Sequence, residues 1–180
     1  AMLQNQQSPR PLFAYQQSGI QPDIVALAKG LGGGIPVGAV IAREDIGLAM
    51  GPGSHGSTFG GNPLAMAVAN SVLDVLEEDG FMHHVQQISA YLLSRLTEIA
   101  GTYPKPINEI KGLGLLRGIG LNERLPAAEL SAMLRAKMVL TVPAGLNTLR
   151  ILPPLIITHS EVDILCDALT ACLSEVSNQK

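Results

Sequence analysis

The sequence has few aromatic residues: Phe, Tyr and Trp make up 3% of its 180 residues, and Trp is absent. A surface that binds nucleic acid by base stacking is therefore not expected. Lys and Arg number only 12 and form no basic run, and the net charge of -3 also argues against a nucleic-acid partner. Long hydrophobic runs are missing as well, because Gly, Pro or charged residues interrupt them, so neither a membrane-spanning helix nor a membrane partner is expected.

Cysteine is scarce. Cys166 and Cys172 are the only two in the sequence, and they stand six residues apart in an expected helix, where their Cα atoms are too far apart for a disulfide. A reduced, cytoplasmic protein is therefore expected. No signal peptide is visible, and no metal site is expected.

Glycine, in contrast, is abundant, and five glycines lie in residues 30–38, directly after Lys29. The apolar residues 24–28 before this lysine predict a strand buried on both faces, with residues 37–42 as its neighbour. A lysine at the end of such a strand would point into a cavity, where desolvation frees its nitrogen to attack a carbonyl. A Schiff-base lysine needs this arrangement. For Lys29 taken alone, a solvated lysine beside a loop is the alternative.

The glycines do not form a nucleotide-binding loop. The order here is Lys-Gly, whereas a P-loop has Gly-Lys followed by Ser or Thr, and Pro36 prevents a helix from opening on these glycines. Nucleotide binding is therefore disfavoured.

Ser57 and Thr58 lie in a second polar stretch, residues 54–63, which ends with Asn62 and Pro63 at an expected helix start. Hydroxyls and free backbone amides before a helix N-terminus favour an anion, so this stretch is a candidate phosphate site. An ordinary loop capped by Asn62 explains the same residues, and the sequence leaves both interpretations open.

Arg150 is the third candidate. It lies in an apolar strand that ends at two prolines, a setting in which a guanidinium usually has a carboxylate partner. An internal Asp or Glu and a substrate carboxylate are both compatible with the sequence.

The rest of the chain predicts alternating helices and short strands. Helices are expected from Asn62, over residues 85–99 and 126–137, and from a capping box at Thr158 and Glu161 to about residue 176. Strands are expected at residues 107–110, 113–121, 139–142 and 148–152, with a turn at residues 143–145 between the last two. The predicted organisation is a polar tail (1–11), a part of a larger α/β domain (12–63), a helical linker (64–100) and a small α+β domain (101–180).

Three stretches, residues 22–34, 55–64 and 149–155, occur in the order and spacing found in class III pyridoxal-phosphate aminotransferases. Over residues 12–176 the sequence resembles this family, most closely its acetylornithine branch, followed by its ornithine branch. The resemblance implies the C-terminal part of the PLP-transferase type I fold, that is, the end of the large-domain sheet followed by the small C-terminal domain. It also implies pyridoxal 5'-phosphate as the cofactor.

The resemblance further implies a role for each candidate residue. Lys29 would form the Schiff base with the cofactor and later move a proton. Ser57 and Thr58 would bind the cofactor phosphate, in this family usually across a dimer interface. Arg150 would clamp the α-carboxylate of glutamate or 2-oxoglutarate.

The sequence also departs from the family pattern. Residues 12–16 of this sequence, Leu-Phe-Ala-Tyr-Gln, resemble a stretch of the family. In the family an acidic motif precedes this stretch, and its Asp pairs with the pyridinium nitrogen of the cofactor. Residues 3–11, which stand at that place here, contain no acidic residue. Met138 stands where the family commonly has glycine after a helix. If that position is left-handed, its side chain costs about 1 kcal/mol.

The expected function is that of the C-terminal portion of an acetylornithine-type aminotransferase of arginine biosynthesis. The complete protein would move an amino group between a terminal amine, such as N-acetylornithine, and 2-oxoglutarate. One alternative is a non-catalytic truncated domain that keeps the fold and the dimer surface, and another is an ornithine or other omega-aminotransferase. Either a homo-oligomer or pairing with an upstream half is expected, and whether this chain alone is an enzyme stays open.

Overall fold

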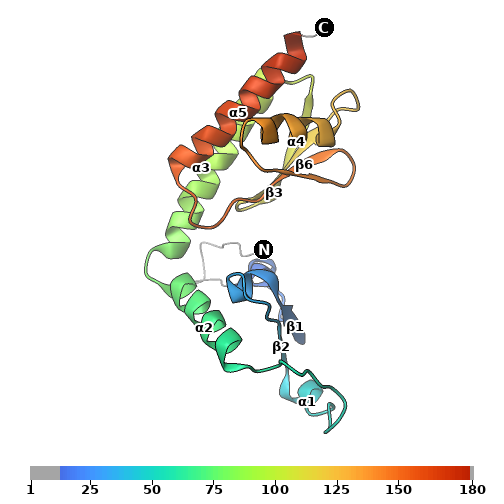
Figure 1. The fold of residues 1–180 in the computed structure, drawn as a ribbon, viewed down its shortest axis with the longest axis vertical. Coiled ribbons are helices and arrows are strands. Elements are labelled where there is room, and N and C mark those ends of the chain that lie inside the picture. Colours follow the sequence, from blue (N-terminus) through green and yellow to red (C-terminus); the bar gives the residue numbers. More distant parts are fainter. Residues whose placement is uncertain (1–12, 179–180) are drawn as a thin grey trace. The chain divides into compact units, whose positions relative to one another are not determined.

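A computed structural model describes residues 13–178 of the chain (Figure 1). These residues divide between Met82 and His83 into two compact units. None of the helices in the described part is both long and apolar enough to cross a membrane. The expected polar tail lies outside the described residues.

The unit of residues 13–82 contains a two-stranded sheet and one long helix. In chain order its elements are η1 (Ala14–Ser18), β1 (Ile24–Leu27), η2 (Lys29–Gly32), β2 (Ala39–Ala42), α1 (Glu44–Gly47) and α2 (Pro63–Glu77). β1 and β2 pair in antiparallel fashion, with Ile24 opposite Ala42. Arg43, directly after β2, forms an ion pair with Asp23 at 2.6 Å and so ties the open ends of the two strands together.

The exposure of β1 and β2 corrects the prediction of a doubly buried strand. Residues of β1 alternate between exposed and half-buried, and every residue of β2 is exposed, Val40 to 70%. A strand that is buried on both faces needs a packed layer on each side of its sheet. Within residues 13–82 these two strands have no such layers.

α2 begins as the sequence predicts. The Asn62 side chain accepts a hydrogen bond from the backbone nitrogen of Ala65 at 2.9 Å, and Pro63 occupies the first turn, where its missing N–H costs nothing. The helix buries Ala69 and Leu76, whereas Val75 is 43% exposed.

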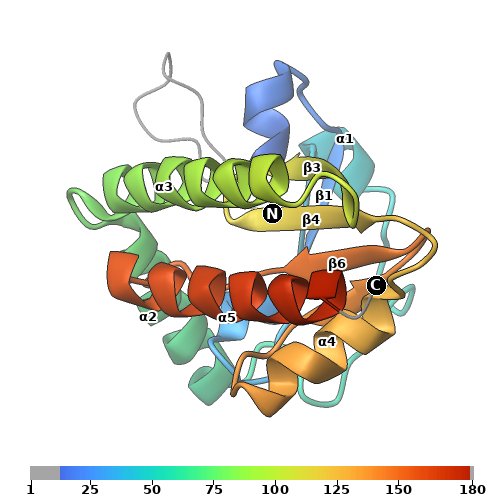
Figure 2. The ribbon, with the colours of Figure 1, turned by 90° about the horizontal axis from the view of Figure 1, so that it is seen from above.

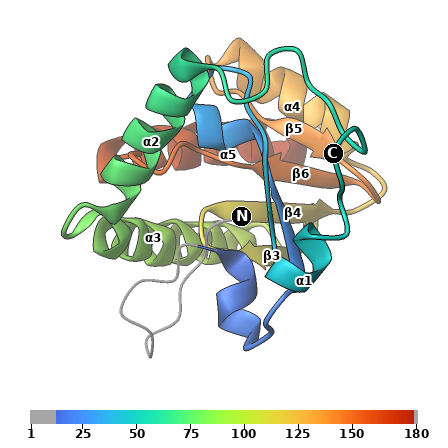
Figure 3. The same ribbon diagram turned by 90° about the horizontal axis from the view of Figure 1, so that it is seen from below.

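The unit of residues 83–178 is a four-stranded antiparallel sheet with helices on one face (Figures 2 and 3). The strand order is β3-β4-β6-β5. The elements are α3 (Phe81–Thr102), which starts just before the unit boundary, β3 (Ile107–Leu113), β4 (Leu116–Leu121), α4 (Ala127–Ala136), β5 (Val142–Ala144), β6 (Thr148–Ile151) and α5 (His159–Asn178).

The core of this unit lies between the sheet and its helices. The helical periodicity predicted for residues 85–99 is confirmed, because Val85, Ile88, Leu92, Leu96 and Ile99 are all buried. Each fully buried side chain of this size stabilises the fold by about 1.5–3 kcal/mol. The other fully buried core residues are Ile119, Leu125, Leu130, Leu134, Leu149, Val162, Cys166, Leu169, Cys172 and Leu173.

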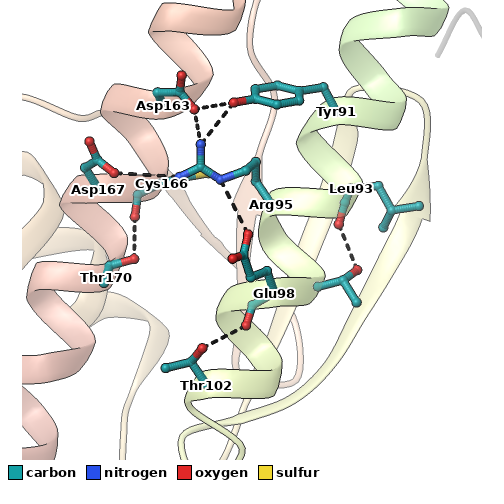
Figure 4. A network of polar contacts seen from close by, with 10 residues as sticks. Tyr91, Leu93, Arg95, Glu98, Thr102, Asp163, Cys166, Asp167 and Thr170 are labelled. Carbon is teal, nitrogen blue, oxygen red and sulfur yellow. Dashed lines mark hydrogen bonds and ion pairs between the residues drawn. The ribbon is translucent and has the colours of Figure 1, made fainter.

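A polar network joins α3 to α5 (Figure 4). Tyr91 donates its hydroxyl hydrogen to Asp163 at 2.6 Å. Arg95, one turn along α3, pairs with Asp163 and lies 3.7 Å from the carboxylate of Asp167. Because Asp163 and Asp167 are one turn apart on α5, these contacts fix how far one helix is shifted along the other.

The capping box that starts α5 is also confirmed. The Thr158 backbone nitrogen donates to the Glu161 carboxylate at 2.8 Å, and the Glu161 backbone nitrogen donates to the Thr158 hydroxyl at 3.3 Å. Further along this helix, Cys166 and Cys172 are buried, and both are free, as their spacing predicts for a disulfide that cannot form.

The strand predicted at residues 139–142 is wrong in position. β5 is Val142–Ala144, so Pro143 and Ala144 belong to the strand and not to the predicted turn. β5 is an edge strand, and proline is tolerated there because one side of the strand has no partner. The turn comes later and is closed by a hydrogen bond from the Thr148 nitrogen to the Gly145 carbonyl at 3.2 Å.

Candidate functional site

Lys29 follows β1 directly and begins η2. Its φ is 57°, which is in the left-handed region and costs a residue with a side chain about 1 kcal/mol. Strain of this kind persists only where the surrounding structure imposes it, and it is concentrated at functional sites. The side chain of Lys29 is exposed, so the predicted cavity and desolvation are not found within residues 13–178.

The glycines after Lys29 serve packing within the chain. A Cβ at Gly33 would lie 3.1 Å from Val72 of α2, and a Cβ at Gly32 would lie 2.7 Å from Val37. These two glycines therefore let the turn approach α2 and the chain that follows. A Cβ at Gly30 or Gly34 would meet nothing within 4 Å, so these two glycines are not required by packing within the chain.

Ser57 and Thr58 lie in an exposed turn just before α2. The turn is held by a hydrogen bond from the Gly60 nitrogen to the Ser57 carbonyl at 3.3 Å and by one from the Asn62 amide to the Phe59 carbonyl at 2.8 Å. Asn62 caps α2, as one interpretation of the sequence expects. Neither the Ser57 nor the Thr58 hydroxyl has a hydrogen-bond partner in the described part of the chain, so both are available to a ligand.

Arg150 is the exposed residue of β6, whereas its neighbours Thr148, Leu149 and Ile151 are buried. It lies opposite Gly118 on β4. No ion pair involves Arg150 among residues 13–178, so the internal carboxylate partner that the sequence left open is not found there. Its guanidinium can therefore bind a carboxylate from outside in a bidentate manner.

Lys111 is a second cation on the same face of the sheet. The strand pairing sets Lys111 of β3 opposite Gly118, which in turn lies opposite Arg150. The Lys111 ammonium lies 2.8 Å from the carboxylate of Glu109, two residues earlier on the same face. Neither Lys111 nor Glu109 was predicted from the sequence to bind a ligand. The available signal was the pair of glycines at alternate positions of β4, Gly118 and Gly120.

The candidate residues are divided between the two units. Lys29, Ser57 and Thr58 belong to residues 13–82: Lys29 begins the turn that packs on α2, and the two hydroxyls precede the N-terminus of this helix. Arg150 belongs to residues 83–178.

The sequence matches a known family and known relatives. The model of the class III aminotransferase family matches residues 11–173. Acetylornithine aminotransferase 1 of Bradyrhizobium diazoefficiens is 46% identical over 169 residues, which cover 94% of this chain and 41% of that protein. The acetylornithine aminotransferase of Agrobacterium fabrum is 49% identical over 149 residues, covering 83% of this chain and 37% of that protein.

Solved structures confirm the fold expected from the resemblance. The ornithine delta-aminotransferase of Plasmodium falciparum matches with a TM-score of 0.86 and 29% identity, over 94% of this chain and 44% of that one. The N-acetylornithine aminotransferase of Stenotrophomonas maltophilia matches with a TM-score of 0.81 and 32% identity, over 94% and 44%. The chain therefore has the architecture of the C-terminal portion of these enzymes.

The chain spans about two fifths of the length of these relatives, 41% of the Bradyrhizobium protein and 44% of the Plasmodium chain. The family is pyridoxal-phosphate-dependent, and one matching structure, an ornithine aminotransferase of Toxoplasma gondii, has this cofactor at partial occupancy in its active site. Since the family match extends over residues 11–173, the chain belongs to the class III aminotransferases.

Proposed function

We propose that this chain carries the cofactor lysine and the carboxylate-binding arginine of an acetylornithine-type aminotransferase. The complete protein moves an amino group between a terminal amine, such as N-acetylornithine, and 2-oxoglutarate in the cytoplasm. The observation that carries the proposal is the conformation of Lys29, a left-handed lysine held directly after a strand at the start of a turn packed on α2.

The residues of the unit 13–82 fit pyridoxal phosphate in two respects. The ammonium of Lys29 has no ion-pair partner among the described residues, and the hydroxyls of Ser57 and Thr58 have no hydrogen-bond partner there. An aldehyde needs such a free amine, and a phosphate needs such donors near a helix N-terminus. When bound, the cofactor supplies an aldehyde that links to amines and a ring that accepts electrons.

Lys29 performs two tasks in this proposal. Its Nζ holds the cofactor when no substrate is present. When it does not hold the cofactor, the same Nζ would be the base that moves a proton on the substrate. A residue with both tasks has to be fixed close to the reacting atoms, which gives a reason for the strained backbone at this position.

Ser57 and Thr58 hold the phosphate through their hydroxyls, assisted by the positive end of α2. In the proposed assembly this loop serves the neighbouring subunit of a homodimer.

Arg150 binds the α-carboxylate of glutamate or 2-oxoglutarate. A guanidinium offers two parallel N–H groups to one carboxylate, which both attracts the substrate and orients its reacting carbon. The lack of an internal ion pair for Arg150 within residues 13–178 supports this role.

Two alternatives have specific support. The exposed strands β1 and β2, which lack a packed layer within residues 13–82, favour a domain that does not turn over by itself. The TM-score of 0.86 to an ornithine aminotransferase keeps ornithine as a second candidate amino donor.

The test is amino transfer to 2-oxoglutarate after co-expression of this chain with the upstream portion of an acetylornithine aminotransferase. We expect transfer from N-acetylornithine to exceed transfer from ornithine, and Lys29→Ala to lower the rate by on the order of 1000-fold. Lys105→Ala, a change of an exposed lysine in the other unit, is the matched control and should leave the rate unchanged.

Equal activity of the Lys29→Ala variant would contradict the proposal, and faster transfer from ornithine would change the assigned amino donor. Transamination by the 180-residue chain alone would rule out the non-catalytic alternative.

A further inference from the structure

We propose that a pocket in the unit of residues 83–178 binds a small organic anion with a ring-sized apolar body and one carboxylate, such as benzoate. The pocket has a volume of about 150 Å³. The chain just before β3, the loop between β4 and α4 and the last turn of α5 form its walls. None of the residues assigned to amino transfer lines it, so this inference is independent of the proposed function.

The floor of the pocket is apolar. Pro106 and Leu125 line it and are buried, and Val176 of α5 lines it and is half-buried. An engineered apolar cavity of about 150 Å³ is large enough to bind benzene. An apolar body of the size of one aromatic ring therefore fits this pocket.

Two cationic residues lie at the rim of the pocket. Lys105 and Arg124 both line it, and both are exposed. Neither has an ion pair or a side-chain hydrogen bond within residues 13–178. Long cationic side chains keep the charged end in water while the stem covers apolar surface, so the two charges stand at the mouth above the apolar floor. A carboxylate at the mouth can accept charge-assisted hydrogen bonds from both.

Asn122 sets these two cationic residues beside each other, although they are far apart in the sequence. Its side-chain amide donates to the Lys105 carbonyl, and its side-chain oxygen accepts a hydrogen bond from the Arg124 backbone nitrogen at 2.9 Å. Its backbone nitrogen donates to the Pro106 carbonyl at 3.1 Å. The rim is therefore ordered before a ligand arrives, which lowers the entropic cost of binding.

The remaining walls are also held by hydrogen bonds within the unit. The Leu125 carbonyl accepts a hydrogen bond from the Asn147 side-chain amide at 3.1 Å. The Ser177 hydroxyl donates to the Leu173 carbonyl at 2.8 Å, so its hydrogen is already used. Among the described residues no Asp or Glu lines the pocket, so its charge is positive and selects an anion over a neutral molecule of the same shape.

The experiment compares benzoate with benzamide, which has the same ring without the charge, and with acetate, which has the charge without the ring. Each is titrated into the full 180-residue chain, and binding is followed by NMR shifts of the backbone amides that line the pocket. We expect benzoate to bind about tenfold more tightly than benzamide, the effect of two partly exposed charge-assisted contacts. Benzoate should also bind at least about tenfold more tightly than acetate, which leaves the apolar floor uncovered.

Variants assign the preference for the anion to the rim. Lys105→Met and Arg124→Met keep an apolar stem and remove one charge, so each should lower the ratio of benzoate to benzamide affinity about threefold. The double variant should bring this ratio to about one and leave benzamide binding unchanged. Arg135→Met, which changes an exposed arginine of α4 that does not line the pocket, is the matched control. The unfolding temperature of each variant separates loss of binding from loss of fold.

Two results would overturn the inference. The first is equal affinity for benzoate and benzamide, or no binding of benzoate, in the unmodified chain. The two cations would then serve only the last turn of α5, because positive charges stabilise the C-terminal end of a helix without any ligand. The second is a preference for benzoate that survives in the double variant. Acetate that binds as tightly as benzoate would contradict the part assigned to the apolar floor.

Discussion

Asn147 caps a helix that begins 20 residues earlier in the chain: its side-chain oxygen accepts a hydrogen bond from the backbone nitrogen of Ala127 at 2.7 Å. Its amide nitrogen donates to the backbone carbonyls of Asn122 at 2.7 Å and Leu125 at 3.1 Å. Its φ is 51°, a left-handed conformation that asparagine tolerates better than most residues. Asn147 therefore joins the β5–β6 turn to the β4–α4 loop, three residues before Arg150.

The first prediction concerns this residue. Asn147→Ala removes the side chain that caps the helix and makes these hydrogen bonds. It also leaves an alanine in a left-handed conformation, which is unfavourable for a residue with a Cβ. The free energy of unfolding should therefore fall by about 3 kcal/mol. Asn147→Gly loses the same hydrogen bonds but relieves the backbone, so it should lose about 1 kcal/mol less. Urea unfolding measures both. Equal losses in the two variants would show that the left-handed backbone at residue 147 does not affect the free energy of unfolding.

The second prediction concerns Met138, whose φ is 64° and whose side chain is 90% exposed. Met138→Gly removes the left-handed strain and exposes almost no buried surface, so it should raise the free energy of unfolding by about 1 kcal/mol. Met138→Ala keeps a Cβ at the same φ and is the control. Stabilisation by Ala as large as that by Gly would point to the loss of the long side chain instead.

The local parts of the fold could be predicted from the sequence. The start of α2 at Asn62 and that of α5 at Thr158 depend on residues three positions away, and the core face of α3 follows from spacings of three and four. Such features are encoded within a few neighbouring residues. The left-handed conformation of Met138 was raised only by the resemblance, since the family commonly has glycine there, and its φ is 64°.

Features that depend on distant partners could not be predicted. The cap from Asn147 to Ala127 and the row that joins Lys111 to Arg150 both require the strand order β3-β4-β6-β5, which no local pattern states. β5 was misplaced because proline usually marks a turn, and it is admitted here only because the strand is an edge. The apolar residues of β1 and β2 predicted burial, yet exposure depends on what packs against a strand and not on its own composition.

The third prediction concerns the capping box of α5. Hydrogen bonds from the Thr158 backbone nitrogen and hydroxyl lower the pKa of Glu161 below its ordinary value of 4.5. A lowered folded-state pKa stabilises the fold at pH values above the ordinary one, and the contribution disappears as the pH falls through the folded-state pKa. The stability difference between the unmodified chain and Glu161→Gln should therefore be constant above about pH 5 and shrink toward pH 3.

The control for this pH dependence is Glu161→Gln in a Thr158→Val background, which lacks the hydroxyl. There the pH-dependent difference should be smaller. A difference that grows as the pH falls would contradict the assignment.

The fourth prediction concerns the thiols. Burial raises the pKa of Cys166 to about 11, and it also raises the pKa of Cys172. Both side chains are inaccessible, and the thiolate is the reactive form, so labelling by Ellman's reagent at pH 8 should be at least about 100-fold slower in the folded chain than in denaturant. Rapid labelling of both thiols without denaturant would show that α5 separates readily from the core.

The most direct test of the account is whether Lys29 is the lysine that holds the cofactor. The chain, co-expressed with the upstream portion of an acetylornithine aminotransferase, is mixed with pyridoxal phosphate, reduced with borohydride and digested, and the modified lysine is identified by mass spectrometry. The account predicts that the adduct forms on Lys29 and that Lys29→Ala shows no comparable adduct elsewhere. An adduct spread evenly over the exposed lysines, or none on Lys29, would contradict it.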